Sequence, residues 1–211
     1  HVTYTVRHGL LTGMKRKGGL GFLPEALVGR GETAETAFWR GLDLRGKVVF
    51  DIGAFQGLLT LFFARQARQV VCYEPNSRNH RRLADNVRLN ALENVVIRKV
   101  GIGAEPRTST LVWSPTMPGG ASVEGTIAGG LRSSGKHWQL EEVAITTLDR
   151  DVAEASLSAP DLVKVDIEGL ELDLSWAGLG FTALLTVATS LFFGLAPAVR
   201  ASKADVLESS G

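Results

Sequence analysis

The chain has 211 residues, 45% hydrophobic and 21% charged, which is the size and composition of one globular domain with room for a short appendage. Its formal net charge of +1 provides no global field that would favour nucleic acid or an anionic membrane. The only cysteine, Cys72, excludes an internal disulfide and fits a reducing compartment, so we expect a cytoplasmic protein. Because Cys72 lies in an apolar strand, we interpret it as a small buried core residue.

The first 46 residues predict an N-terminal segment that ends in a short helix. Residues 1–30 are mixed and rich in glycine, and we interpret Lys15, Arg16 and Lys17 as a solvated basic loop. Contact with a phosphate or an acidic substrate is the alternative for these three cations. The stretch "GETAETAFWRGLDL" has apolar residues near helical spacing and predicts the helix.

From residue 47, short apolar strands alternate with segments of helical length. Strands are predicted at 48–51, 70–74 and 95–100, and helices at 58–68 and 78–90. This alternation is typical of βαβ units, which build a parallel sheet covered by helices on both faces. Residues 101–142, rich in Gly, Ser and Pro, predict an irregular β-containing insertion on the substrate side. "VAITTLD" and "PDLVKVDIEG" predict two further strands.

The stretch "VVFDIGAFQGLLTLFF" places an acid and two glycines between the first strand and its helix. In an open parallel sheet, ligands bind beyond the carboxyl ends of the strands, where Asp51 lies. Gly53 and Gly57 allow a tight turn and a close approach of the backbone to a ligand. Glu74, which ends the next strand, is placed to accept hydrogen bonds from ribose hydroxyls. The pattern therefore predicts a nucleoside ligand.

The spacing also indicates which nucleoside binds. A dinucleotide fingerprint would read G-x-G-x-x-G, whereas this chain has D-x-G-x-x-x-G, and the anion of Asp51 would repel a phosphate. A carboxylate suits the cationic amino-acid end of S-adenosylmethionine instead. The alternative is a strand–helix turn that contains glycine and has no chemical role.

These stretches, together with "GGLGFLP", "VVCYEPNSRNHRRLADNVRLNALENVVI", "ITTLD" and "PDLVKVDIEGLEL", resemble the FkbM family of methyltransferases from residue 18 to about residue 174. The resemblance implies a class I methyltransferase (Rossmann-like) fold, S-adenosylmethionine as cofactor, and methylation of a hydroxyl oxygen. It also implies the cofactor-binding residues, which are Asp51, Gly53 and Gly57 at the methionine end, with Ala54 in the same turn, Glu74 at the ribose and Asn76 at the adenosine edge. The chain departs from relatives at Val100–Gly103, so the adenine contact there is expected to be made by backbone only.

The strand in "PDLVKVDIEG" ends in a second acidic cluster, on the same side of the sheet as Asp51 and Glu74. We predict Asp166 and Glu168 as the catalytic residues, with Asp166 removing the acceptor's proton or orienting its hydroxyl. Glu168 has an alternative role as a cap of the following helix. His137 in the insertion is a weaker candidate for acceptor contact. No metal-ligand spacing occurs, so no metal is predicted.

The partner predicted for this site is a small-molecule or glycan hydroxyl acceptor. The chain has no N-P-P-Y-like or D-P-P-Y-like tetrapeptide, which would suit methylation of a flipped base. With a net charge near zero as well, no nucleic-acid substrate is expected.

The resemblance to methyltransferases stops at Leu174. The next 26 residues, counted from Leu174 to Val199, carry no charge, and the end of the chain resembles a MacB/FtsX-type transporter permease segment. We therefore predict a methyltransferase domain at 47–174, with its cofactor-binding core at 47–100, and a separate tail at 175–211. The sheet would be incomplete at its C-terminal side. Residues 176–199 would form an apolar helix that either spans a membrane or packs against the sheet.

The tail leaves two alternatives to an active enzyme. The chain could be a catalytically inactive, nucleoside-binding remnant of a methyltransferase. It could also be a membrane-attached fragment of a transporter fusion, which would give it membrane contact through residues 176–199.

Overall fold

A computed structural model of the chain describes residues 2–18, 33–114, 117–123 and 138–167. All of these residues belong to one compact unit, residues 1–171, and a second unit comprises residues 172–211. The elements in chain order are β1 (Val2–Thr5), β2 (Lys15–Gly18), α2 (Ala34–Gly41), β3 (Val48–Ile52), α3 (Leu58–Ala64), β4 (Gln69–Tyr73), α4 (Ser77–Leu89), β5 (Val95–Arg98), β6 (Gly101–Ile102), β7 (Arg107–Ser114), β8 (Met117–Val123), β9 (Gln139–Thr146), α6 (Leu148–Glu154) and β10 (Leu162–Val165).

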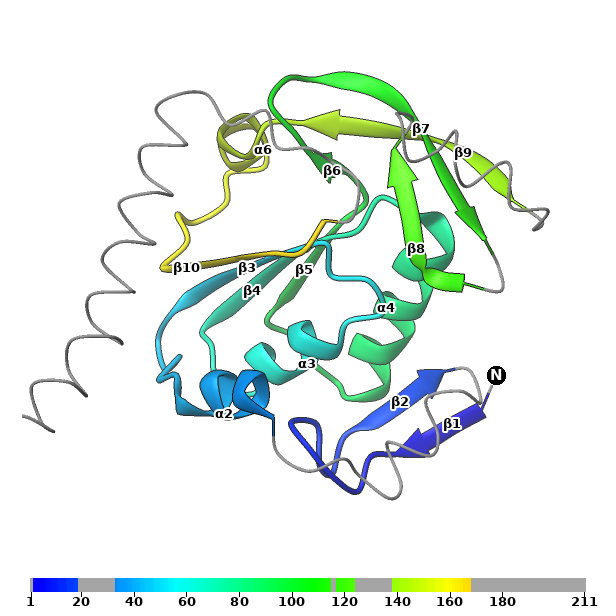
Figure 1. Ribbon diagram of the computed structural model, residues 1–211. Helices are drawn as coiled ribbons and strands as arrows, with labels where there is room; N and C mark the ends of the chain where they lie inside the picture. The colour runs from blue at the N-terminus through cyan, green and yellow to red at the C-terminus, as the bar shows by residue number, and fades with distance from the viewer. Residues whose placement is uncertain (1, 19–32, 115–116, 124–137, 168–211) are drawn as a thin grey trace, which may run out of the picture. The chain divides into compact units, whose positions relative to one another are not determined.

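The central sheet has four parallel strands in the order β10-β3-β4-β5 (Figure 1). The inner strands β3 and β4 are mostly apolar and do not alternate, and every residue of β3 is buried, as expected for a strand covered on both faces. The outer strand β10 alternates between half-buried and exposed residues. The helices α3 and α4 connect β3 to β4 and β4 to β5. The predicted parallel sheet built from βαβ units is therefore confirmed.

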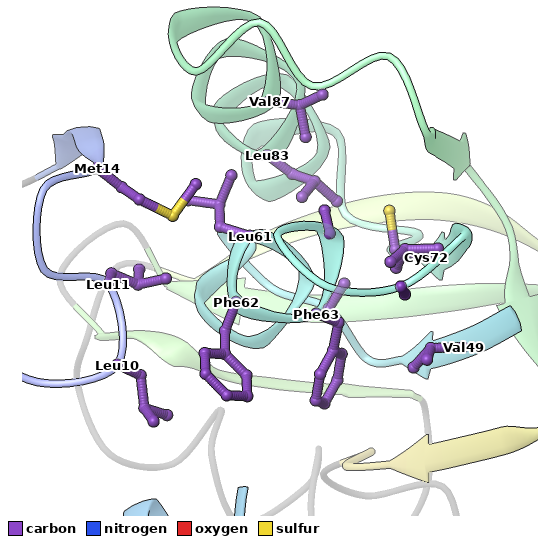
Figure 2. Close-up of a cluster of buried hydrophobic side chains, with 14 of the residues drawn as sticks. Leu10, Leu11, Met14, Val49, Leu61, Phe62, Phe63, Cys72, Leu83 and Val87 are labelled. Carbon is purple, nitrogen blue, oxygen red and sulfur yellow. The ribbon is translucent and has the colours of Figure 1, made fainter. Parts of the chain in front are cut away.

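Two apolar clusters cover the two faces of this sheet. On one face, Leu61 and Phe63 of α3 and Leu83 of α4 pack with Val49 and Cys72 (Figure 2). On the other face, strand side chains meet apolar residues of α6 and the segment that follows it; these are Val48, Phe50, Val71 and Tyr73 from the strands with Leu148, Val152 and Leu157. Cys72 is fully buried, as predicted, and burial raises the pKa of its thiol far above the ordinary value.

Strand order reverses beside β3. The chain proceeds from β3 outward to β4 and β5, and then returns to place β10 on the opposite side of β3. In an open α/β sheet, the carboxyl ends of the strands at such a reversal point form the usual ligand site. The topology therefore predicts a ligand site at the carboxyl ends of β3 and β10.

The segment predicted as an irregular insertion forms a second sheet, with the strand order β6-β9-β7-β8. β7 and β9 are eight residues each and pair antiparallel. On β9, Val143 and Ile145 are buried whereas Glu142 and Ala144 are exposed, so this strand alternates as one with a single covered face.

The prediction of a solvated basic loop at Lys15–Lys17 was wrong. These residues form β2, which pairs antiparallel with β1. The backbone amide of Lys17 donates to Asn86 on α4 at 2.7 Å, and its ammonium pairs with Asp85 at 2.8 Å. Arg16 is buried, with 6% of its surface exposed. The hairpin is held by contacts with residues about 70 positions away, which local composition does not reveal.

The tail predictions lie outside the described residues. This applies to the permease-like segment 175–211, the apolar helix 176–199 and the incomplete C-terminal side of the sheet. Within the described part of the chain, no helix is both long enough and apolar enough to cross a membrane. The division at residues 46/47 and 174/175 stays a prediction.

Candidate active site at the carboxyl ends of the parallel strands

The turn between β3 and α3 has an unusual backbone that requires glycine at two positions. Gly53 has φ of +76° and Gly57 has φ of +86°, both in the left-handed region. A Cβ on Gly53 would overlap the carbonyl oxygen of Asp166, and one on Gly57 would crowd the side chain of Leu83. Phe55 between them also has positive φ, at +53°, which is uncommon for a residue other than glycine.

Asp51, at the end of β3, is fully buried and engaged on both carboxylate oxygens. Its Oδ2 accepts a hydrogen bond from the hydroxyl of Thr60 on α3 at 2.6 Å. Its Oδ1 lies 3.1 Å from the ammonium of Lys164. Because Asp51 has no exposed surface, its carboxylate faces the interior rather than an open site. Asp51 therefore fixes the start of α3 and the position of Lys164.

Lys164 joins the ends of β3 and β10. It is the register partner of Asp51, and its side chain is only 10% exposed. Its ammonium also lies 3.6 Å from Asp166 Oδ2 and donates to the carbonyl of Gly53 at 3.3 Å. We did not single out Lys164 from the sequence. The signal was a lysine inside a short apolar strand, two residues before Asp166 and therefore on the same side of β10.

Asp166 follows β10 directly and holds the turn from the other side. Its backbone amide donates to the carbonyl of Ile52 at 3.0 Å. In contrast to Asp51, its carboxylate is largely solvent-accessible, with 72% of the side chain exposed. Asp166 thus lies at the carboxyl end of its strand, as predicted, and its catalytic role stays a prediction. The other catalytic candidates, Glu168 and His137, lie outside the described residues.

Glu74 lies at the end of β4 with 6% of its surface exposed. One of its oxygens accepts from the amide of Phe55 at 2.8 Å, and the other accepts from the amide of Asn76 at 2.9 Å. Burial raises the pKa of Glu74 to about 7, although the amides of Asn76 and Phe55 oppose the shift. The side chain of Asn79 also hydrogen-bonds to Glu74. A carboxylate has about four acceptor positions, so about one remains for a ligand.

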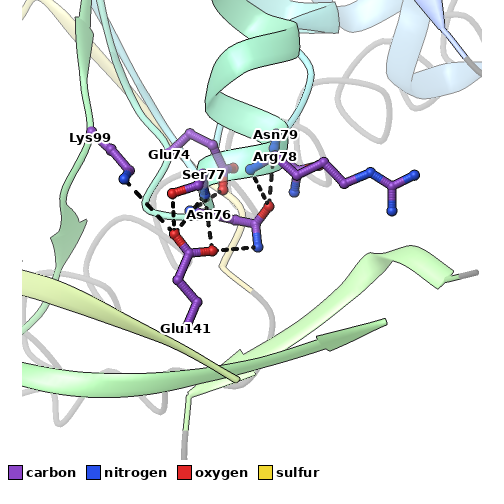
Figure 3. A network of polar contacts seen from close by, with 7 residues as sticks. All are labelled: Glu74, Asn76, Ser77, Arg78, Asn79, Lys99 and Glu141. Atoms are coloured by element: carbon purple, nitrogen blue, oxygen red, sulfur yellow. Dashed lines mark hydrogen bonds and ion pairs between the residues drawn. The ribbon is translucent and has the colours of Figure 1, made fainter. Parts of the chain in front are cut away.

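Asn76 begins α4. Its side-chain oxygen accepts from the amides of Arg78 at 3.1 Å and Asn79 at 3.0 Å, which makes it the N-cap of the helix (Figure 3). Ala54 is buried, and its amide donates to the carbonyl of Tyr73 at 3.0 Å. The predicted cofactor residues are therefore all present around one edge of the sheet, and Asn76 has a structural role whatever else it binds.

A model of the family described as "Methyltransferase FkbM domain" matches residues 51–174, which is more than half of the chain. The chain belongs to the FkbM methyltransferase family. Membership confirms the resemblance seen in the sequence and makes S-adenosylmethionine the cofactor. A search of curated proteins finds no match to this chain.

Several solved structures share part of this fold. They include an rRNA methylase from Streptococcus thermophilus (16% identity, 34% of this chain and 45% of that chain, TM-score 0.30). They also include precorrin 8w decarboxylase from Methanobacterium thermoautotrophicum (24% identity, 33% of this chain and 40% of that chain, TM-score 0.28). A third is phosphoethanolamine N-methyltransferase 1 from Haemonchus contortus in complex with phosphoethanolamine and S-adenosylhomocysteine (22% identity, 29% of this chain and 13% of that chain, TM-score 0.27). This chain spans less than half the length of each, and none carries an argument about substrate.

The hydrogen-bonding groups of the FkbM domain fit a nucleoside cofactor. Glu74 keeps acceptor capacity for a ribose hydroxyl at the end of β4, beside the turn that contains Gly53. For metals, the described residues contain no group of three or more His, Cys, Asp or Glu placed to hold an ion.

Proposed function

We propose that this FkbM domain transfers a methyl group from S-adenosylmethionine to a hydroxyl oxygen of a small molecule or sugar. The observation that supports the proposal is the meeting of Asp51, Lys164 and Asp166 around the Gly53 turn, at the point where strand order reverses. Glu74, at the end of the neighbouring strand, adds the acceptor that a ribose needs.

In this proposal, the chain's residues divide into those that hold the cofactor and those that face the acceptor. Glu74 accepts from the ribose hydroxyls, Asn76 borders the adenosine, and the backbone around Gly53, Ala54 and Gly57 receives the methionine end. Asp51 acts from the interior, because it is fully buried in contact with Thr60 and Lys164. It keeps the ammonium of Lys164 at the turn.

S-adenosylmethionine supplies a methyl group bound to a positively charged sulfur. With this methyl donor bound, the chain's residues would have to position the acceptor hydroxyl and take its proton. Asp166 is the group that we assign to the proton, because its carboxylate is exposed at the strand end. Glu168 is the second predicted catalytic residue.

The experiment that tests the function has two stages. Calorimetry with S-adenosylmethionine measures binding, and release of S-adenosylhomocysteine in the presence of a panel of sugars and hydroxylated small molecules measures transfer. Binding with acceptor-dependent release supports the proposal. Binding without release from any acceptor would favour an inactive, nucleoside-binding remnant, and failure to bind would contradict the proposal altogether.

Replacing Asp166 with asparagine should lower turnover about 100-fold or more, the usual effect of removing a general base. The cofactor affinity should stay within about twofold, because the amide of Asp166 still bonds to Ile52 and the side chain is exposed. The measurement is the rate of S-adenosylhomocysteine release at saturating cofactor. Asp149→Asn, an exposed carboxylate at the start of α6, serves as the matched control. Near-full turnover in Asp166→Asn would remove Asp166 from the chemistry.

The affinity for S-adenosylhomocysteine should rise about tenfold between pH 6 and pH 8, because Glu74 has a raised pKa of about 7. Ribose hydroxyls donate best to the ionised carboxylate, so binding below pH 7 must release the proton from Glu74. Calorimetry in two buffers of different ionisation enthalpy measures that release. Glu74→Gln should abolish the dependence, and a pH-dependent affinity that persists in this variant would assign the titration to another group.

The same pKa predicts an opposite trend in the stability of the protein without ligand. A carboxyl group whose folded pKa is raised is favoured in its neutral form, so its stabilising contribution is complete below its ordinary pKa and is lost as the pH rises through about 7. Urea unfolding of the wild type and of Glu74→Gln at several pH values separates this contribution from that of other groups.

A further inference from the structure

Glu141 of β9 reaches from the second sheet to the first turn of α4. Its carboxylate accepts from the backbone amide of Ser77, at 3.0 Å for Oε1 and 3.1 Å for Oε2, and also from the Ser77 hydroxyl. The side-chain amide of Asn76 donates to Oε2 at 3.3 Å, and the ammonium of Lys99 lies 3.9 Å from Oε1 (Figure 3). The side chain is 18% exposed.

The placement of this acid on β9 is unusual. Glu141 lies on the same face of the strand as Val143 and Ile145, both of which are buried, whereas its neighbour Glu142 faces solvent. Burying a carboxylate is costly unless donors replace its water. Here the donors are those of Ser77 and Asn76, at the positive end of the α4 dipole. The strand therefore carries this acid at a register where the first turn of α4 supplies donors to it.

Glu141 is linked to the predicted ribose acceptor through two consecutive residues. The amide of Asn76 donates to Glu74, and the amide of the next residue, Ser77, donates to Glu141. The start of α4 is thus held between two carboxylates, one on the central sheet and one on the second sheet. A second contact between the same two parts is made by Arg78, whose guanidinium carbon lies 5.6 Å from the centre of the Trp113 ring on β7.

We propose that Glu141 is a positioning residue of the cofactor site, which holds the first turn of α4 from the second sheet and thereby fixes Glu74 for the ribose. The inference rests on the proposed function, since it concerns the same cofactor. In this proposal the second sheet contributes to cofactor binding. A movement of β9 would change the affinity for S-adenosylmethionine through Ser77 and Asn76.

Calorimetry with S-adenosylhomocysteine tests this role in single variants. Glu141→Ala should weaken binding about tenfold or more. Glu141→Gln should retain part of the affinity, because an amide oxygen can still accept from Ser77 but has lost the charge that faces Lys99 and the helix dipole. Glu142→Ala is the matched control, since it removes the same side chain from the exposed face of the same strand, and it should bind as the wild type does. If Glu141→Ala does not fold, Glu141→Gln carries the test.

A double-mutant cycle with Glu74→Ala distinguishes positioning from a general loss of structure. If Glu141 acts through Glu74, the double variant should bind little worse than Glu74→Ala alone, because effects through one shared group do not add. Fully additive losses would overturn the inference, as would an unchanged affinity in both Glu141 variants. Wild-type protein that binds no S-adenosylhomocysteine would overturn the proposed function and this inference with it, so the two failures are distinguishable.

Discussion

Replacing Lys164 with methionine is expected to lower the free energy of unfolding by about 3–5 kcal/mol, the usual cost of leaving one partner of a buried ion pair alone. Asp51 is fully buried, and within the described residues the ion pair with the Lys164 ammonium, 3.1 Å away, is the only polar contact of its Oδ1. The variant also loses the bond to the Gly53 carbonyl. Urea unfolding monitored by circular dichroism measures the loss.

Two further variants show whether the uncompensated charge of Asp51 is the cause. Asp51→Asn combined with Lys164→Met removes both charges and should recover part of the stability that the single variant loses. Lys47→Met is the surface control, since Lys47 and Asp161 form a pair 3.4 Å apart with side chains 50% and 40% exposed, and it should change stability little. A Lys164→Met variant as stable as the wild type would show that the pair contributes nothing to the fold.

The second large effect is expected from Gly53→Ala. A Cβ at this position would overlap the backbone carbonyl of Asp166, which cannot turn away as a side chain could, and φ is +76°. The combined strain and overlap should cost about 2–5 kcal/mol. The turn and the end of β10 would have to separate, so turnover should fall about 100-fold even where the variant folds.

Gly46→Ala separates the backbone strain from the overlap. Gly46 has φ of +72°, close to that of Gly53, but a Cβ there meets no atom within 4 Å. It should therefore lose only about 1–2 kcal/mol from the left-handed conformation and should keep its turnover. Equal losses of stability in the two variants would mean that the contact between Gly53 and Asp166 has no special role.

Local sequence patterns predicted the central sheet because each of its strands can be recognised from its own residues. Continuous apolar runs separated by helical periods specify parallel strands, and β3, β4 and β5 lie within about two residues of their predicted ends. The hairpin of β1 and β2 was missed because it is held by Asp85 and Asn86 of α4 and by Asn90, which caps that helix, rather than by its own composition. The seven-residue helix α6 was missed because it is too short to show a period, although Thr147 caps it.

The residues of the candidate site were predictable only where an acidic residue lies at the end of a recognisable strand. Glu74 and Asp166 are acids at strand ends, and the structure places both at the edge of the sheet. Asp51 was predicted at the methionine end of the cofactor, and this role stays a prediction. Its contact with Lys164 could not be predicted, because it depends on the register between β3 and β10. Glu141 gave a weak signal, as an acid in line with Val143 and Ile145, and its link to Ser77 appears only in three dimensions.

A crystal structure of the protein with S-adenosylhomocysteine tests the central claim most directly. The predicted result is a ligand whose ribose hydroxyls lie within hydrogen-bond distance of the Glu74 carboxylate, with its amino-acid end at the turn that contains Gly53 and its sulfur towards Asp166. A ligand bound away from the ends of β3 and β4, or none at a saturating concentration in well-ordered crystals, would contradict the claim that this edge of the sheet is the cofactor site.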